Sequence, residues 1–241
     1  MRIIIATIKS SNIRNAIEFK KRNKQNIDTF IITNKNELTY ERVKEINPRY
    51  IFFPHWSWII SPEIFKEFTC IVFHMTDLPF GRGGSPLQNL IERGIKNTRI
   101  SAIRVDEGID TGDVYLKKNL NLNETAEEIF IRASKIIFEE MIPEIIEKQP
   151  IPQKQIGEAV VFKRRTPDQS KIKPDFTLEK IYDYIRMLDA EGYPRAFIRF
   201  GKYRLEFSRA SLKTGRIIAD VEIREEGEEI EQNIGYSSSP R

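Results

Sequence analysis

Short apolar runs alternate with amphipathic segments along the first half of the chain. The runs are rich in Ile, Val and Phe, as buried parallel strands are, and they lie at residues 2–8, 28–34, 49–56, 69–75 and 99–106. Segments with apolar side chains at helical spacing separate them, at residues 11–23, 37–46, 61–68 and 85–95. Strands that alternate with helices favour right-handed βαβ units. We therefore predict an α/β fold with a mostly parallel sheet and helices on both faces.

The strongest helical pattern covers residues 125–149. Thr125 and Glu128 have the spacing of a capping box at its start. One apolar face follows, made of Ile129, Phe130, Ala133, Ile136, Ile137 and Met141. Two prolines between residues 149 and 155 then indicate a linker, so we expect a first domain over residues 1–150.

A smaller α+β region is expected over residues 151–241. Residues 177–188 have a helical pattern, and the stretches 195–200 and 203–210 flank Gly201-Lys202 as the strands of a two-residue hairpin. The acidic run 222–231 and the final "SSSPR" are expected to be exposed to solvent.

Composition and charge narrow the class of protein. The chain has 241 residues, of which 40% are hydrophobic, enough for one substantial core with a small appendage. Its net charge of +4 comes from 39 basic and 35 acidic residues spread over both regions, so a nucleic-acid partner is not favoured. A single cysteine, Cys70, excludes an internal disulfide. The apolar run at the N-terminus is too short to span a membrane, so we expect a soluble cytoplasmic protein without a membrane partner. The oligomeric state stays open, a homodimer included.

Two polar loops carry the candidate chemistry. His74 lies at the end of the run 69–75, and Asp110 lies in the acidic loop that follows the run 99–106. Ligands bind beyond the carboxyl ends of parallel strands, so both loops are expected at one edge of the sheet. A histidine beside a carboxylate can act as a general base, and Arg82 offers a planar cation for an anionic group. His55, Trp56 and Trp58 are left open between a ligand pocket and ordinary packing.

Several common signatures are absent from the sequence. The first strand leads into "KSSNI", which lacks the glycines of a dinucleotide-binding turn, and no phosphate-binding P-loop occurs. Gly-x-Ser-x-Gly, the nucleophile elbow, is missing as well. With two histidines and one cysteine, the chain has no ligand spacing typical of zinc, so no metal is expected.

The stretches "FHMTDLPFGRGGSPLQ" and "VDEGIDTGDV" resemble the formyltransferase family that uses formyltetrahydrofolate. The family pattern is Asn-x-His-x-Ser-x-Leu-Pro, then Arg-Gly, Pro-x-Gln, and a later Asp-x-Gly-x-Asp-Thr-Gly-Asp. The residues in step with the first part are His74, Leu78, Pro79, Arg82, Gly83, Pro86 and Gln88. Asp110 follows His74 by 36 residues, as the pattern requires. The resemblance covers roughly residues 1–125 and is closest in look to amino-sugar N-formyltransferases.

The resemblance implies a Rossmann-like fold and transfer of a formyl group from N10-formyltetrahydrofolate to a primary amine. The catalytic residues it implies are His74 and Asp110. It places the folate donor against Trp58, Ile59, Ile60, Leu78, Asp106 and Ile109. The acceptor would contact Thr76, Asp77, Arg82, Gly83 and Gln88. Asp106 and Asp113 can also be interpreted as residues that only shape their loop.

The sequence also bears on the acceptor, and it departs from the family pattern at one position. The loop variant and the small, near-neutral region after residue 150 favour an amine on a sugar or sugar nucleotide; the alternatives are methionyl-tRNA and a binding module without turnover. Val72 replaces the family asparagine, whose amide by resemblance stabilises the oxyanion. Thr76, Asn89, a backbone amide of residues 81–84 and protonated His74 are candidate substitutes.

Overall fold

The computed structural model describes residues 1–225, which form two compact units. The first unit comprises residues 1–86, 97–121 and 130–162, and the second comprises residues 87–96, 122–129 and those from Lys163 onward. Each unit therefore draws on segments that are distant in the sequence. Most of the acidic run 222–231 and the terminal "SSSPR", expected to be exposed, lie outside the described residues.

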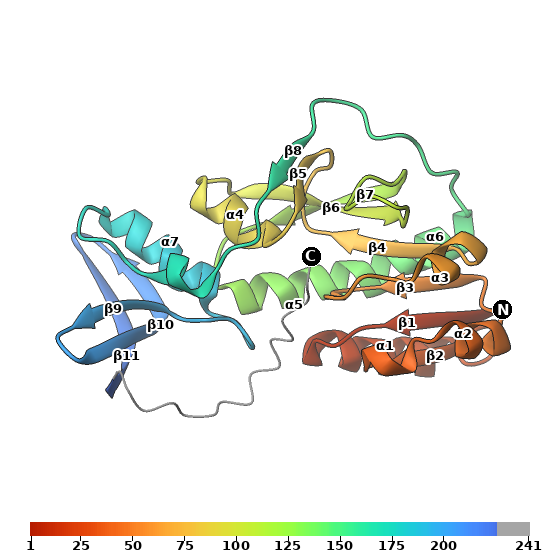
Figure 1. Ribbon diagram of the computed structural model, residues 1–241, viewed down its shortest axis with the longest axis horizontal. Helices are drawn as coiled ribbons and strands as arrows, with labels where there is room; N and C mark the ends of the chain where they lie inside the picture. The colour runs from red at the N-terminus through yellow and green to blue at the C-terminus, as the bar shows by residue number, and fades with distance from the viewer. Residues whose placement is uncertain (226–241) are drawn as a thin grey trace. The chain divides into compact units, whose positions relative to one another are not determined.

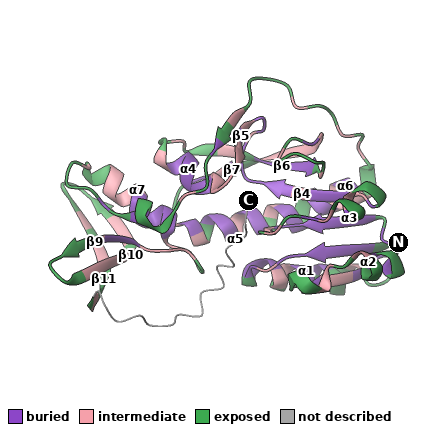
Figure 2. Cartoon of the chain, in the orientation of Figure 1, coloured by how far each residue is buried: buried purple, intermediate pink, exposed green. Residues whose placement is uncertain are grey.

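The first unit is built on a mixed sheet with the strand order β2-β1-β3-β4-β6-β7 (Figure 1). Its parallel part contains β1 (Arg2–Ala6), β2 (Asp28–Ile32), β3 (Tyr50–Phe53) and β4 (Cys70–His74). All four match apolar runs in the sequence. Strands β1, β3 and β4 are almost wholly buried (Figure 2), because a central parallel strand is covered on both faces. The Rossmann-like prediction is confirmed.

The last two strands of this sheet run the other way. β6 (Asn97–Arg104) pairs with β4 in antiparallel orientation, with His74 opposite Ser101 and Ile71 opposite Arg104. β7 (Val114–Asn121), which the apolar pattern did not reveal, is antiparallel to β6. The loop after β6 therefore starts beside Cys70, at the opposite end of β4 from His74, where Val105 N donates to Cys70 O. The expectation that both polar loops leave the same edge was wrong.

Helices cover both faces of the sheet, as predicted. α2 (Tyr40–Ile46) and α3 (Pro62–Glu67) pack against one face, where Ile4, Ile51 and Phe53 belong to the same buried cluster as Val43 and Ile64. α1 (Ser10–Asn23) packs with the helix after β7, through Asn15 Nδ2–Ser134 Oγ at 2.8 Å and the Phe19 and Phe138 rings. By strand alternation this second group faces Ile3 and Ile5.

The long helix expected at residues 125–149 is present in three segments. These are α5 (Ala126–Ile136), a π-helical turn over Ile137–Met141, and α6 (Ile142–Lys148). Its capping box forms as predicted, since Thr125 N donates to Glu128 Oε2 at 2.9 Å and Glu128 N donates to Thr125 Oγ1 at 3.3 Å. Pro143 lacks an N–H, so the regular hydrogen-bond ladder cannot pass this point. We attribute the π turn to this residue.

The second unit contains α7 (Leu178–Leu188) and a sheet ordered β11-β10-β9. Strands β9 (Ala196–Phe200) and β10 (Tyr203–Lys213) form the expected hairpin, in which Phe200 pairs with Tyr203 around Gly201-Lys202. β11 (Arg216–Glu225) was not predicted. Its residues Ile217, Ala219, Val221 and Ile223 alternate with side chains of the other face, a pattern typical of a strand with one apolar face, which the prediction did not use.

Two short strands lie beside the sheet of the first unit. β5 (Phe80–Gly83) falls within the predicted glycine-rich loop, and β8 (Val160–Phe162) follows the predicted linker; they pair in parallel. α4 (Pro86–Glu92) begins just after β5. Among the helices described in residues 1–225, none is long and apolar enough to cross a membrane.

Candidate active site

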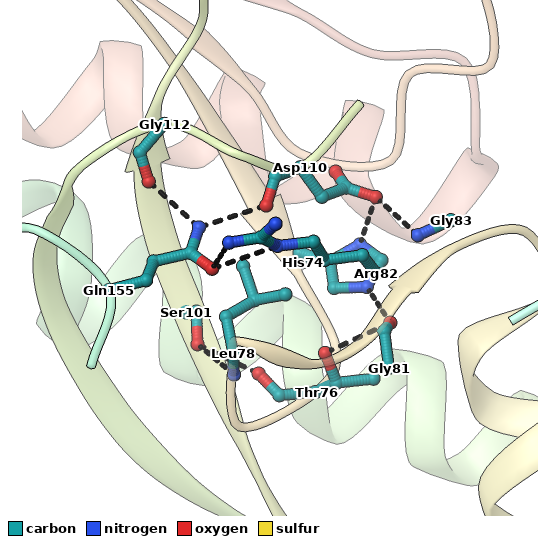
Figure 3. Close-up of polar contacts among 10 residues, drawn as sticks. All are labelled: His74, Thr76, Leu78, Gly81, Arg82, Gly83, Ser101, Asp110, Gly112 and Gln155. Carbon is teal, nitrogen blue, oxygen red and sulfur yellow. Dashed lines mark hydrogen bonds and ion pairs between the residues drawn. The ribbon is translucent and has the colours of Figure 1, made fainter. Parts of the chain in front are cut away.

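The loop after β4 is fixed by hydrogen bonds to its own backbone. Ser101 Oγ, from β6, donates to Thr76 O at 2.7 Å, and Thr76 Oγ1 donates to Gly81 O at 3.3 Å (Figure 3). Gly81 has φ +79°, and a Cβ there would lie 2.7 Å from the Phe162 ring. Only glycine fits this close approach. The loop therefore holds Gly81 O at a defined place beside His74.

His74 lies between two oxygen acceptors. Its Nε2 is 2.7 Å from Gly81 O, and its Nδ1 is 3.4 Å from Asp110 Oδ2. A backbone carbonyl can only accept, so Nε2 carries a proton. The side chains of His74 and Asp110 are 9% and 16% exposed, which leaves the pair reachable but largely shielded from water. The predicted meeting of these two residues is confirmed.

The Asp110 carboxylate, opposite Nδ1, can face either of two protonation states of the His74 ring. A neutral imidazole with its proton on Nε2 would direct a lone pair from Nδ1 at the Asp110 carboxylate. A doubly protonated ring donates to both oxygens instead. The Nδ1–Oδ2 distance of 3.4 Å is longer than the 2.7–2.9 Å usual for a charge-assisted hydrogen bond, so Nδ1 and Asp110 are close neighbours without a short hydrogen bond.

Asp110 reaches His74 because the loop between β6 and β7 folds back over β4. Asp110 itself has φ +54°, a left-handed conformation uncommon outside glycine. Its Oδ2 also accepts from Gly83 N at 2.9 Å. A Cβ on Gly112 would lie 1.7 Å from Arg104 O, so the chain can make this return only with glycine there. The motif "DTGD" thus supplies both the carboxylate and the turn that carries it.

Arg82 is positioned by a residue that the sequence did not single out. Its Nε and Nη2 donate to Gln155 Oε1 at 3.1 and 2.8 Å. Gln155 lies in the segment interpreted as a linker, where polar neighbours such as Gln153 and Lys154 gave no reason to single it out. No periodic signal could have found it, because its partners are 43 to 73 residues away in the sequence.

The residues predicted to contact folate divide into exposed and buried groups. Ile59 and Ile109 are 73% and 74% exposed, an unusual exposure for isoleucine, and Trp58 is half-buried against Trp56. Ile60 and Leu78 are buried in the protein interior. Asp106 shapes its own loop, where its Oδ1 accepts from Gly108 N and Thr111 Oγ1. The exposed group is the part of the predicted set that a ligand can reach.

The residues predicted to contact the acceptor are likewise dispersed. Asp77 forms an ion pair with Lys117, and Thr76 is fully buried with its hydroxyl on Gly81 O. Gln88 belongs to the second unit, where its buried amide donates to Met187 O at 3.1 Å. Arg82 and Gly83 lie in the first unit with His74. The acceptor contacts stay predictions.

Other features of the site region concern packing. Val72 is half-buried and packs against the apolar cluster that includes Ile51 and Cys70, so the position of the family asparagine is occupied by core packing. His55 has φ +58° and its ring stands edge-on to Phe130 at 5.3 Å. No group of three or more His, Cys, Asp or Glu suited to a metal ion occurs within residues 1–225.

Comparison with known proteins identifies the family of this chain. A model described as formyl transferase matches residues 32–137, and one described as methionyl-tRNA formyltransferase, C-terminal domain, matches residues 167–224. A solved structure, "Methionyl-tRNA formyltransferase from Clostridium thermocellum", is 74% identical with a TM-score of 0.92, and the match covers 93% of this chain and 99% of that one. The chain belongs to the formyltransferase family.

More distant formyltransferases extend the comparison. A methionyl-tRNA formyltransferase of Thermodesulfovibrio yellowstonii is 28% identical over 63% of this chain and 52% of its own length. The chain thus spans about half the length of the curated relatives it matches. A sugar N-formyltransferase of Shewanella has a TM-score of 0.66 at 14% identity, over 91% of this chain and 96% of that one. At that identity the likeness concerns the formyltransferase fold alone.

Proposed function

We propose that this chain transfers the formyl group of N10-formyltetrahydrofolate to a primary amine, giving a formamide and tetrahydrofolate. The observation that carries the proposal is the His74–Asp110 contact at 3.4 Å, built from the two motifs that a formyltransferase needs. A folate- or sugar-binding module without turnover has no use for a shielded, ordered pair of this kind. The pair therefore favours an enzyme over a binding module.

The exposed apolar residues fit the donor. The aromatic part of a folate needs apolar walls, and Ile59 and Ile109 present such walls on two loops. Lys66 of α3 pairs with Glu107 at 2.9 Å, which ties the β3–α3 region to the loop that carries Ile109. The donor would bind against both isoleucines. When bound, the folate supplies the activated formyl group.

Residues of this chain would transfer the proton and stabilise the charge that develops during the reaction. Attack by the amine nitrogen on the formyl carbon places negative charge on the formyl oxygen and positive charge on the nitrogen. Asp110 would orient the imidazole and take the proton that the attacking amine loses, and His74 in its doubly protonated form would offer Nδ1–H toward the developing oxyanion. This gives protonated His74 the role of the amide missing at Val72. Transfer of the proton to N10 of the donor would let the C–N10 bond break, so that the formamide and tetrahydrofolate leave.

For the acceptor, we propose the amine of methionyl-tRNA over the sugar amine that the loop motif favours. The 74% identical structure and the curated relatives carry that name, and the C-terminal model matches the second unit. The charge of this unit supports it too: residues 163–225 contain 15 Lys and Arg against 10 Asp and Glu. The near-neutral count for residues 151–241 arose because four Glu and one Arg lie in the last sixteen residues.

The test measures formyl transfer to methionyl-tRNA and to a panel of amino-sugar nucleotides, with N10-formyltetrahydrofolate as donor. We expect formylmethionyl-tRNA as the product. The apparent affinity for the tRNA should fall steeply as salt rises, because each phosphate contact contributes about −0.7 to −0.9 to the slope of log K against log[salt]. Turnover of a sugar nucleotide alone, with little salt dependence, would overturn the acceptor and keep the chemistry.

The catalytic pair has its own control. Asp110→Asn should lower kcat by about 10²–10⁴-fold, because the amide can no longer stabilise charge on His74. Asp113→Asn, in the same loop, should stay close to the parent, since Asp113 is engaged through its backbone carbonyl with Arg104 N. Equal kcat for Asp110→Asn and the parent would remove the pair from the mechanism.

A further inference from the structure

Gln155 uses both ends of its amide at the candidate site (Figure 3). Its Nε2 donates to Asp110 O and to Gly112 O, each at 2.9 Å. Its Oε1 accepts from two nitrogens of the Arg82 guanidinium at 3.1 and 2.8 Å. An amide has two N–H donors and two lone pairs on its oxygen, so every hydrogen-bonding position of Gln155 is occupied.

The partners determine which way the amide points. Carbonyl oxygens only accept and a guanidinium only donates, so the nitrogen must face Asp110 and Gly112 while the oxygen faces Arg82. Neither a carboxylate nor an apolar side chain can serve both groups. Of the twenty side chains, a long carboxamide is the one that meets this requirement at this reach.

The backbone around Gln155 is fixed next to the same loop. Val114 N donates to Gln153 O at 2.7 Å, and Gln153 N donates to Val114 O at 2.9 Å. This two-bond bridge joins the segment to the first residue of β7, directly after the "DTGD" turn. Gln155, two residues on, is half-buried, whereas the Gln153 side chain is exposed. The bridge brings Gln155 to the turn, and its side chain completes the contact.

The turn that Gln155 holds is the one that carries the carboxylate. Asp110 has φ +54°, which its side chain tolerates but does not enforce. Gln155 bonds the backbone of Asp110 and Gly112, while Gly83 N bonds the carboxylate of Asp110. Since Arg82 precedes Gly83 on β5, the two loops are joined at two adjacent points. The His74–Asp110 distance thus depends on a frame in which Gln155 is the central hydrogen-bonding group.

We infer that Gln155 is a positioning residue: it fixes the Asp110 carboxylate opposite His74 and holds the Arg82 guanidinium in place for an anionic group of the acceptor. The inference rests on the proposed function, which it deepens. It gives the segment of residues 149–155, which lies within the first unit, a part in catalysis. Gln155 has two separate effects. Its hydrogen bonds to the backbone carbonyls position Asp110, and its hydrogen bonds from the guanidinium position Arg82.

Two variants separate these effects in steady-state kinetics. Gln155→Leu removes both sets of bonds, so kcat should fall about 10- to 100-fold from the misplaced carboxylate and the acceptor KM should rise as Arg82 loosens. Gln155→Glu keeps an acceptor for Arg82 but directs oxygen at two carbonyls. Its kcat should fall as in the leucine variant, with the acceptor KM near the parent value. Gln153→Leu is the matched control and should keep both constants.

A second readout needs no turnover. The chain has two histidines, His55 and His74, so ¹⁵N-labelled imidazoles give two sets of ring signals, and His55→Gln assigns them. In Gln155→Leu the His74 ring nitrogens should change chemical shift, because Asp110 moves, while the His55 signals stay. Gln153→Leu should leave both sets unchanged. All variants are compared at equal folded fraction, checked by circular dichroism.

The outcomes decide the inference separately from the proposed function. Unchanged His74 signals in folded Gln155→Leu, or a kcat within twofold of the parent, would overturn the positioning role. A kcat loss in Gln155→Leu that Gln155→Glu restores would assign Gln155 to Arg82 alone and reject its action on Asp110. If no acceptor is formylated by the parent, the proposed function fails, and the His74 signals still decide whether Gln155 positions Asp110.

Discussion

At the scale of single residues, the site combines a histidine between two acceptors with an apolar neighbour. His74 Nε2 faces Gly81 O and Nδ1 faces Asp110, while Val72, on the same face of β4 by strand alternation, packs into the core. Of these two residues, only His74 offers polar groups at the end of the strand. The other residues on this face of β4, Val72 and Cys70, serve packing.

Val72→Asn should destabilise the protein without improving turnover. The half-buried valine packs against apolar side chains, so an amide there lacks assured partners and costs about 1–3 kcal/mol. Urea unfolding and formyl transfer at matched folded fraction measure the two effects, with Val72→Ala as the control for lost packing alone. A gain in kcat of tenfold or more would mean that the oxyanion lacks a donor in the parent.

Cys70 should be unreactive in the folded protein. Burial raises the pKa of its thiol to about 12, against an ordinary value of 9.0, and the side chain is 1% exposed. Because the folded pKa is the higher one, burial of the neutral thiol stabilises the fold fully below pH 9, and this contribution is lost as the pH rises toward 12. Ellman's reagent at pH 8 should label the single thiol only after unfolding in urea. Rapid labelling of the native chain would contradict this.

At the scale of secondary structure, two connections matter most. The β6–β7 loop must return across β4 to bring Asp110 to His74, and Gly112 makes the return possible. In the second unit, Glu92 at the end of α4 forms an ion pair with Arg165 and accepts a hydrogen bond from Tyr184 of α7. The first connection requires glycine at position 112, and the second depends on the Glu92 carboxylate.

Gly112→Ala should be more harmful than alanine at a glycine with open surroundings. The new Cβ would meet Arg104 O, whereas Gly94→Ala meets nothing within 4 Å and bears only the strain of φ +73°, about 1–2 kcal/mol. We expect Gly112→Ala to lose more stability than Gly94→Ala and to lower kcat, because Gly112 O is a partner of Gln155. Thermal unfolding and kinetics test both parts; equal losses in stability would show that the turn relaxes freely.

Glu92 should make the second unit sensitive to acid. Burial alone would raise the pKa of Glu92, but hydrogen bonds from Tyr184 and Arg165 and the charge of Arg165 outweigh it and hold the pKa below its ordinary 4.5. A lowered folded pKa stabilises the fold above pH 4.5, and this contribution is lost as the pH falls through the lowered value. Glu92→Gln should therefore show a smaller loss of Tm between pH 6 and pH 3 than the parent. Glu179→Gln, an exposed change on α7, should behave like the parent.

At the scale of the whole molecule, charge and exposed apolar surface indicate where ligands act. The basic excess of residues 163–225 is offset by an acidic C-terminal stretch, so the net charge of +4 conceals it. Ile59 and Ile109 expose apolar surface on the loops of the first unit. We connect the first feature with the acceptor and the second with the donor.

Tetrahydrofolate should raise the Tm of the whole chain. A ligand at a hundred times its Kd stabilises the folded state by about 2.7 kcal/mol, which for a chain of this size corresponds to a shift of roughly 5–10 °C. Ile109→Ser should abolish most of the shift at little cost to the unliganded Tm, because Ile109 is 74% exposed. Ile156→Ser, at another exposed isoleucine, is the control. A full shift in Ile109→Ser would place the folate elsewhere.

The sequence by itself determined the features that depend on near neighbours. Apolar periodicity located β1 to β4 and their helices, and the Thr125–Glu128 spacing placed the capping box, because these signals involve residues a few positions apart. The spacing of His74 and Asp110, with the family resemblance, identified the pair that lies at 3.4 Å.

Only the tertiary structure decided the direction of β6, the existence of β7, and the contacts of Gln155. An apolar run of the same composition suits a parallel or an antiparallel neighbour, so the sequence could not say that the loop after β6 starts at the far end of β4. The partners of Gln155 lie 43 to 73 residues away, and nothing local marks the residue. Such contacts follow from how distant segments pack together, which is a property of the folded chain as a whole.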